Sequence, residues 1–295
     1  MRYYIYIFIV SCFVLCLVSC DPSLDGPEPD EVFVKYFGEG SNEVHDMVLT
    51  DNGEVIILAS YTKNNTDVDF YLIKTGTDGN EIQSVILDSI STGQVEVPTS
   101  IKAIGNDEYL ITGYTVADTV VGVWFKVNSS LDVTSLDSTG SSGFNYIKKV
   151  FIQDMIKSTE TDGSERFVVL GHSSFPIEND PINDPNNSQI YLSKVDDNDS
   201  TYWVKAHGKT GNDEAFALFE KDNGSLVMIG TTSSASGAYS GKNVFIIETN
   251  SRGTSDQNSR ISGIPGASLT ADDIPHGVIK TPSGFSIVGS TRTAT

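Results

Sequence analysis

The chain has 295 residues, and its 39 acidic and 19 basic side chains give a formal net charge of −20. Such a polyanion repels nucleic acid and anionic surfaces, so no nucleic-acid partner is predicted. All three cysteines lie within the first 20 residues, which excludes disulfides, cysteine-metal sites and thiol nucleophiles from the rest of the chain.

The chain begins with a secretory signal pattern. Arg2 precedes an apolar run at residues 3–18, and polarity begins abruptly at Cys20. The run is shorter than the roughly 20 apolar residues that a membrane-spanning helix needs. Residues 1–19 are therefore predicted to be a signal peptide that is cleaved between Ser19 and Cys20.

The residues at the cleavage site carry a modification signal. Leu17-Val18-Ser19-Cys20 resembles the lipobox of bacterial lipoproteins, in which the cysteine is lipidated and becomes the new N-terminus. The resemblance implies a palmitate-type acyl anchor on Cys20 and a lipid bilayer as a partner. Ile9-Val10-Ser11-Cys12 fits the same pattern, but cleavage there would leave too short an apolar region before it. An uncleaved anchor or an ordinary secreted protein is the alternative.

An acidic tether follows at residues 20–30. Residues 21–31 contain three prolines and five acids, a composition that cannot bury a core and stays extended. The acids resemble the stretch behind the lipidated cysteine of Bacteroidota-type lipoproteins, which implies a surface-exposed place on the outer membrane. A periplasmic location, with the acids as a solvated spacer without a sorting role, is the alternative.

From residue 31 onward the chain is built of repeats. One strand-like segment recurs five times, and each copy follows a short apolar segment and a turn such as Asn52-Gly53. A third and a fourth strand follow most copies, and the period is 54 to 59 residues. Four strands per unit of this size indicate a propeller blade. The copies are at residues 54–62, 108–115, 165–173, 225–232 and 284–291.

Residues 31–295 are therefore predicted to form an all-β fold, a β-propeller of four-stranded blades. A small residue near the end of each second strand, such as Gly113 or Gly230, is expected to let sheets approach closely or bend. The fifth unit stops after its second strand, so we expect an intact ring of six to eight blades, with a closed five-bladed ring as the alternative. The units span about residues 31–88, 89–138, 139–207, 208–261 and 262–295.

The units resemble a family of repeats common in surface and secreted proteins of Bacteroidota. A typical unit combines a Lys-Thr-Phe-Gly-Gly loop, an Asp-Gly hairpin, a Gly-Tyr-Thr strand end and a Tyr-Leu-Ile-Lys strand. The resemblance implies a propeller outside the cell and implies no activity. The first unit carries it best, in Lys35-Tyr36-Phe37-Gly38, Asp51-Asn52-Gly53, Ser60-Tyr61-Thr62 and Tyr71-Leu72-Ile73-Lys74-Thr75.

Four residues are candidate ligands at the mouth of the propeller channel. His45 and His276 each stand eight residues before a hairpin glycine, at the start of the first strand of a unit, and this strand usually lines the channel. Glu43 and Glu214 lie just before first strands and would add acids to the same face. Paired carboxylates can act as acid and base or bind Ca²⁺. For the histidines, inherited framework is the alternative interpretation.

No motif specifies catalysis, a metal site or a cofactor. The acidic run at residues 196–199 lacks the glycine and the terminal glutamate of a calcium loop, so Ca²⁺ is only an alternative to having no cofactor. The polar insert at residues 175–188 and the ring of Trp203 are candidates for contact with a ligand. His172 and His207 are predicted to be structural.

The favoured hypothesis is a membrane-tethered, non-enzymatic propeller that binds a protein or a glycan or serves as a scaffold. The alternative is a propeller hydrolase or lyase that acts on polysaccharide, with channel-facing acids and His45 or His276 as acid or base. A channel without two suitable carboxylates would exclude the enzyme.

Overall fold

The computed structural model describes twelve stretches of the chain. All its strands belong to the unit Phe37–Thr295, whereas the signal sequence, Ser19, Cys20 and the tether lie outside the described residues. Within the described stretches no helix is long and apolar enough to cross a membrane. The stretches are residues 35–37, 41–64, 67–87, 90, 94–135, 143–158, 164–174, 187–197, 200–233, 241–262, 271–281 and 284–292.

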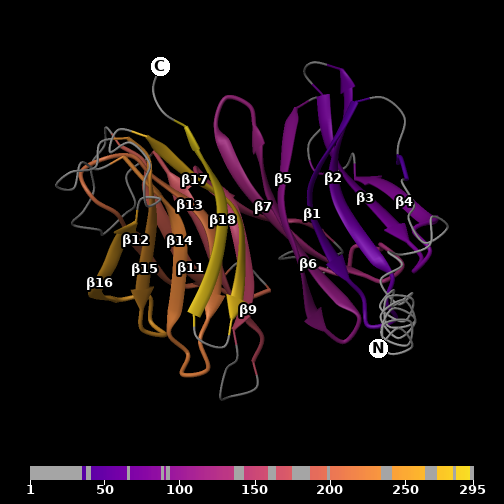
Figure 1. Ribbon diagram of the computed structural model, residues 1–295. Helices are drawn as coiled ribbons and strands as arrows, with labels where there is room; N and C mark the ends of the chain where they lie inside the picture. The colour runs from indigo at the N-terminus through magenta and orange to yellow at the C-terminus, as the bar shows by residue number, and fades with distance from the viewer. Residues whose placement is uncertain are drawn as a thin grey trace, which may run out of the picture. The chain divides into compact units, whose positions relative to one another are not determined.

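The first two blades are antiparallel sheets joined by one parallel bridge between Val68 and Val95 (Figure 1). The first blade contains β1 (Ser41–Leu49), β2 (Val55–Asn64), β3 (Asp67–Thr75) and β4 (Glu81–Leu87). The second contains β5 (Val95–Gly105), β6 (Glu108–Val116), β7 (Val120–Asn128) and the short β8 (Asn145–Lys148).

The next two blades are separate four-stranded sheets, and the fifth is a hairpin. The third contains β9 (Phe151–Ser158), β10 (Arg166–Ser173), β11 (Gln189–Val195) and β12 (Thr201–His207). The fourth contains β13 (Asp213–Glu220), β14 (Leu226–Thr232), β15 (Asn243–Thr249) and β16 (Ser255–Ser262). The fifth contains β17 (Asp272–Thr281) and β18 (Gly284–Arg292). The prediction of an all-β fold with four-stranded units is confirmed, and the size of the intact ring stays a prediction.

The hairpins inside the blades have the turn chemistry expected from the sequence. In the first blade, the Gly53 amide donates to the Thr50 carbonyl at 3.0 Å, and the φ of Gly53 is +79°. In the fourth blade, the Gly224 amide donates to the Lys221 carbonyl at 2.8 Å, and the φ of Gly224 is +77°. Glycine adopts this left-handed conformation without the steric cost of a Cβ atom, which explains the Asn-Gly steps at both turns.

Three of the four apolar clusters among the described residues lie between blades, and the fourth lies within the first blade. One apolar cluster joins Phe70 and Leu72 of the first blade to Phe125 of the second. A second cluster joins Trp124 of the second blade to Phe167 of the third, and similar clusters cover the seam between the third and fourth blades. Burial against the neighbour therefore holds each sheet in place, as the small apolar content of a single blade requires.

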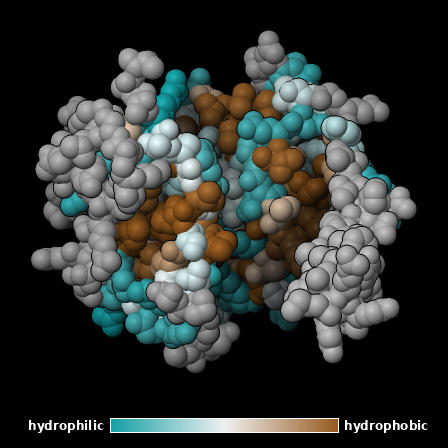
Figure 2. Space-filling view, in the orientation of Figure 1, coloured by the Kyte–Doolittle hydropathy of each residue, from teal (hydrophilic) through white to brown (hydrophobic). Residues whose placement is uncertain are grey.

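Among the described strands, each blade packs mainly against the next blade along the chain. Figure 2 shows apolar surface over the first and the last blade. Several apolar side chains of these two blades are 64 to 68% exposed, namely Val44, Met47 and Leu49 of β1, Ile279 of β17 and Val288 of β18. These side chains lie on strands that do not have a described blade on both sides.

Each blade has a β-bulge in its first strand, opposite the small residue of the second strand. In the fourth blade the register shifts between Ala215 and Ala217, opposite Gly230. A Cβ atom on Gly230 would collide with the carbonyl oxygen of Glu214. The same collision is found at Gly113 and Gly289, so the small residue makes room for the backbone of the paired strand of the same blade rather than for that of a neighbouring sheet. The bulge tilts a carbonyl onto the second strand, and only a small residue leaves room for it.

The substitution Gly230→Ala tests this constraint. Because the added methyl would meet backbone atoms on a strand paired on both sides, we expect a loss of about 1–3 kcal/mol in the free energy of unfolding. Urea denaturation of the two proteins measures the loss. Gly277→Ala is the control, since its methyl would meet only Cγ1 of Val288 at 2.9 Å, a side chain that can rotate. Equal losses in the two variants would contradict the proposed role of the bulge.

Candidate functional site

The first strands of the five blades form the inner wall of the propeller. These strands, β1, β5, β9, β13 and β17, are called the inner strands below, and each packs against the next. The bulge places one residue of each inner strand at an equivalent position. These bulge residues are His45, Thr99, Gln153, Phe216 and His276.

The two bulge histidines have different surroundings. His45 is partly buried, and no described residue hydrogen-bonds its Nε2 atom. Burial lowers the pKa of His45, although the nearby carboxylate of Glu43 opposes this shift. His276 is exposed, and its Nε2 lies 2.8 Å from the hydroxyl of Ser290. His45 is therefore a neutral imidazole at neutral pH, whereas His276 is a solvated side chain with one hydroxyl partner.

The two candidate glutamates also differ. Glu43 is exposed at the start of β1. Glu214 occupies the equivalent place on β13, but both its oxygens accept from the ammonium of Lys242, at 2.7 and 2.8 Å. The two histidines are thus equivalent to each other, and so are the two glutamates. The four candidates do not form one set of ligands. Within the described stretches, no group of three or more His, Cys, Asp or Glu residues is placed to hold a metal ion.

Two aspartates that sequence analysis missed follow the bulges of β1 and β9. Asp46 accepts hydrogen bonds from the amides of Ile101, at 2.9 Å, and Met47, at 2.8 Å. Its equivalent, Asp154, accepts from the amide of Leu218 at 2.7 Å. Each aspartate therefore binds the inner strand of the following blade. The longer β9–β10 connection hides this equivalence, because the distance to the small residue is 13 residues from Asp46 and 17 from Asp154.

The two carboxylates flank one short segment of β5. The amide of Ile101 donates to Asp46, while the hydroxyl of Ser100 donates to Asp154 at 3.2 Å. The ammonium of Lys102, from the same segment, lies 2.5 Å and 2.6 Å from the two oxygens of Asp154. Residues 100–102 therefore hold one carboxylate on each side.

The environments of these two carboxylates are unequal. Burial raises the pKa of Asp46, the amides of Ile101 and Met47 oppose the shift, and the negative charge of Asp154 adds to it. Asp154 is buried, and Lys102 with two amide donors compensates its charge. A carboxyl with a raised pKa beside a salt-bridged one resembles the arrangement of two carboxyls in unequal environments that acid–base catalysis uses.

Further acids are buried where the inner strands begin. Glu96, Asp213 and Asp273 stand at equivalent positions, each at most 3% exposed. Burial raises the pKa of Asp213 to about 6, although the Thr232 hydroxyl and the Lys209 amide oppose the shift. The backbone amide of Asp213 donates to the Ser188 carbonyl at 2.9 Å, across two blades. These acids therefore belong to the seams between blades.

The remaining predicted positions are framework or lie outside the described residues. The imidazole of His172 stacks on Phe151, with ring centroids 4.9 Å apart, and burial lowers its pKa to about 4. His207 is buried as well. Most of the insert at residues 175–188 and half of the acidic run at 196–199 lie outside the described stretches.

Comparisons with known proteins bear on the fold. No protein-family model matches the chain, and no curated protein matches it either. A solved GH93 α-L-arabinofuranosidase of Fusarium graminearum, in complex with arabinobiose, is similar with a TM-score of 0.52 and 12% identity, over 84% of this chain and 74% of that one. A second structure of an α-L-arabinofuranosidase from this organism, with an iminosugar inhibitor, gives a TM-score of 0.51 and 10% identity, over 82% and 72%. The propeller fold is thereby confirmed.

These similarities correct one functional prediction. The hypothesis of a non-enzymatic binding or scaffold module is wrong, because the two similar propellers described above are α-L-arabinofuranosidases. They favour the alternative, a propeller hydrolase that acts on polysaccharide. The absence of a local catalytic motif did not support the non-enzymatic hypothesis, because propeller enzymes assemble their sites from residues on several blades.

The raised pKa of Asp213 predicts a pH-dependent stability. In the unfolded chain this carboxyl ionises near pH 4, but in the fold it ionises near pH 6, so its contribution is present below pH 4 and is lost as pH rises to 6. We expect Asp213→Asn to gain up to about 3 kcal/mol relative to the wild type between pH 4 and pH 7. Urea denaturation at both pH values measures this.

Asp222→Asn is the matched control for Asp213→Asn. Asp222 is fully exposed and meets Lys280 only at 3.4 Å. Its substitution should leave the pH dependence unchanged, because its carboxylate is solvated in both states. A pH-independent difference between Asp213→Asn and the wild type would show that burial does not perturb Asp213.

Proposed function

We propose that this protein is a propeller glycoside hydrolase that acts on a polysaccharide. The observation that supports the proposal is the partly buried carboxyl of Asp46, which shares residues 100–102 with the charge of Asp154 and follows the exposed Glu43 on β1, in a fold shared with an α-L-arabinofuranosidase. Glycoside hydrolysis needs a protonated carboxyl to protonate the leaving oxygen and an ionised carboxylate to assist the attack of water. A hydrolase rather than a lyase fits the similar structures.

In the proposed mechanism Asp46 is the general acid. Its partly buried carboxyl gives its proton to the glycosidic oxygen, and the bond from the anomeric carbon to this oxygen breaks. The exposed carboxylate of Glu43, on the same strand, takes a proton from the attacking water, whose oxygen bonds to the anomeric carbon. Asp154 is a positioning residue, because its charge, held by Lys102, contributes to the raised pKa of Asp46.

Loss of the proton donor tests this mechanism. We expect Asp46→Asn to lower kcat at least about 100-fold, because an amide cannot donate the proton. Release of reducing sugar from a panel of polysaccharides measures the effect, with arabinan first because of the similar structures. The exposed Asp222→Asn is the control and should keep full activity. Unchanged turnover in Asp46→Asn would refute the assignment.

The pH dependence of kcat/KM in the variant Asp154→Asn tests the role of Asp154. Removing its negative charge lowers the pKa of Asp46, so in Asp154→Asn the high-pH limb of kcat/KM should move to lower pH. A merely structural role would lower activity without moving this limb. Thermal unfolding of the variant checks that its fold is intact.

We further propose that the hydrolase works as an outer-membrane lipoprotein, held by an acyl chain on Cys20. The lipobox pattern, the short apolar run at residues 3–18 and the acidic tether support this location. A tether of this composition stays extended and would keep a folded domain clear of the bilayer. A glycan-degrading enzyme at the cell surface would meet polymers that are too large to enter the cell.

Replacement of the lipidated cysteine tests the anchor. In a bacterial host we expect Cys20→Ala to lose incorporation of labelled palmitate and to leave the membrane fraction, because the lipobox thiol that would be acylated is removed. Cys12→Ala is the control, since Cys12 ends the second lipobox-like pattern, and it should be labelled like the wild type. Labelling that depends on Cys12 instead of Cys20 would overturn the assignment.

A further inference from the structure

The inner strand of the fourth blade carries an aromatic side chain that the fold does not explain. Phe216 is the bulge residue of β13, whereas the four equivalent bulge residues are all polar. Its ring is partly buried, and it belongs to none of the apolar clusters among the described residues. Because every other blade has a polar side chain here, the architecture does not require an aromatic ring at this position.

The neighbours of Phe216 along β13 pack into the seams, and Phe216 itself does not. Ala215 and Leu218 belong to the apolar cluster between the third and fourth blades. Phe219 packs against Phe285 of the fifth blade, with ring centroids 4.9 Å apart. Phe216 has no such contact with an aromatic ring among the described residues. Its ring is therefore a partly exposed apolar surface on the inner wall, where a ligand can cover it.

Polar bulge residues stand on the two inner strands that pack against β13. On β9, Gln153 is partly buried, and its side-chain amide makes no hydrogen bond to a described residue. On β17, His276 is exposed, and its Nε2 lies 2.8 Å from the hydroxyl of Ser290. A primary amide offers two N–H donors and a carbonyl acceptor. An aromatic face with an unused amide on the next strand suits a sugar ring, whose C–H face is apolar and whose rim carries hydroxyls.

These two side chains lie next to the carboxylates of the proposed hydrolase. Asp154 follows Gln153 directly in the chain. Its carboxylate accepts from the amide of Leu218, two residues after Phe216, at 2.7 Å. A polysaccharide occupies several neighbouring positions at once, and contacts to units that do not react contribute binding energy to the reaction. A sugar unit beside the one that is cleaved would therefore meet this part of the wall.

The charges around this part of the wall favour an uncharged sugar. None of the five bulge residues is a lysine or an arginine. The ammonium of Lys242 is bound to Glu214, and that of Lys102 is bound to Asp154. Glu43 is exposed and forms no ion pair with a described residue. An anionic sugar would therefore meet a carboxylate without a cation from the bulge residues, and the net charge of −20 adds to the repulsion.

We propose that Phe216 and Gln153 form a sugar-binding subsite that selects an uncharged sugar unit. The C–H face of the sugar stacks on the ring of Phe216, and the amide of Gln153 binds its hydroxyl groups. The subsite rests on the proposed function, because it serves the polysaccharide that Asp46 would cleave. It deepens that function by assigning the class of substrate and two residues that bind it away from the scissile bond.

Isothermal titration of the full chain carrying Asp46→Asn tests the subsite, because this variant is expected to bind a substrate without cleaving it. The probes are the neutral hexasaccharides arabinohexaose, xylohexaose and cellohexaose, and the anionic hexagalacturonate. We expect at least one neutral probe to bind saturably, at least about tenfold more tightly than hexagalacturonate. Adding Phe216→Gln should weaken this binding about tenfold, because the stacking face is lost. Adding Gln153→Ala should weaken it about fivefold.

Three further variants serve as controls. Phe216→Tyr keeps the aromatic face and should keep the binding. Tyr36→Ala removes an aromatic ring that is 93% exposed and lies on no inner strand, so it should bind like its parent. Phe216→Gln introduces the residue type that the third blade has at this position, so we expect its thermal unfolding to match that of the parent. Thermal unfolding of Gln153→Ala likewise separates loss of the subsite from loss of the fold.

Three results would overturn the subsite. They are no binding of any neutral probe at millimolar concentration, tighter binding of hexagalacturonate, and binding that Phe216→Gln and Gln153→Ala leave unchanged. Failure of the proposed hydrolysis has a different result, since a wild type that binds a neutral probe without releasing reducing sugar would refute only the hydrolysis. In an active wild type, Phe216→Gln should raise KM about tenfold and leave kcat nearly unchanged, because stacking away from the scissile bond is equal in the ground and transition states.

Discussion

Burial of each blade against its neighbour is the interaction on which the rest of this protein depends. The part of the chain after Cys20 has no cysteine, so no disulfide replaces this burial. Phe70 packs against Phe125 across the first seam, and Trp124 packs against Phe167 across the second. Asp46 and Asp154 add hydrogen bonds to the inner strand of the following blade. The seams therefore determine both the stability and the position of every inner-strand side chain.

The bulges of the inner strands position the side chains of the candidate site. An extra residue in each inner strand turns the next side chain toward the neighbouring blade, and in two blades this side chain is an aspartate. Both carboxylates bind the same short segment of β5, so the charge of Asp154 influences the pKa of Asp46. Because the fold is shared with unrelated activities, the case for hydrolysis depends on this local pair, with the similar structures as support.

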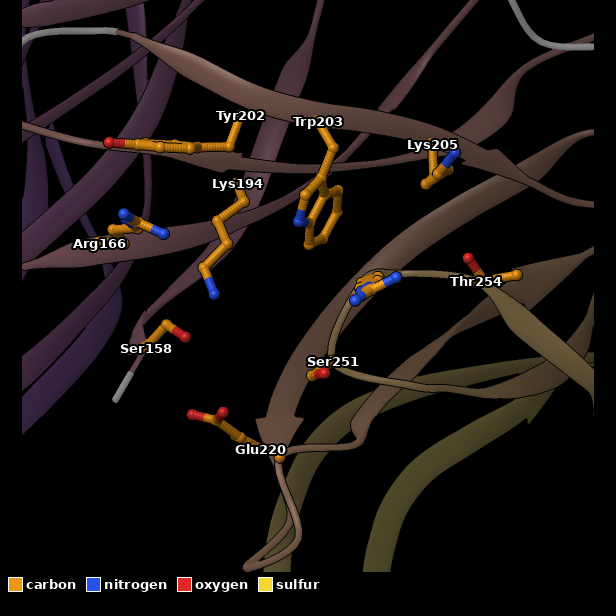
Figure 3. Close-up of a pocket in the computed structure, with 11 residues that line it drawn as sticks. Ser158, Arg166, Lys194, Tyr202, Trp203, Lys205, Glu220, Ser251 and Thr254 are labelled. Carbon is orange, nitrogen blue, oxygen red and sulfur yellow. The ribbon is translucent and has the colours of Figure 1, made fainter. Parts of the chain in front are cut away.

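The sequence by itself determined the strands, the Asn-Gly hairpins and the small residues opposite the bulges, because each depends on contacts within about 60 residues of chain. Only the tertiary structure decided which side chains act together. Asp46 and Asp154 are 108 positions apart. The pocket between the third and fourth blades (Figure 3) is lined by residues as far apart as Ser158 and Thr254. Their proximity follows from the packing of successive blades, and no periodicity within one repeat reports it. For this reason the functional prediction from sequence was wrong where the prediction of the fold was right.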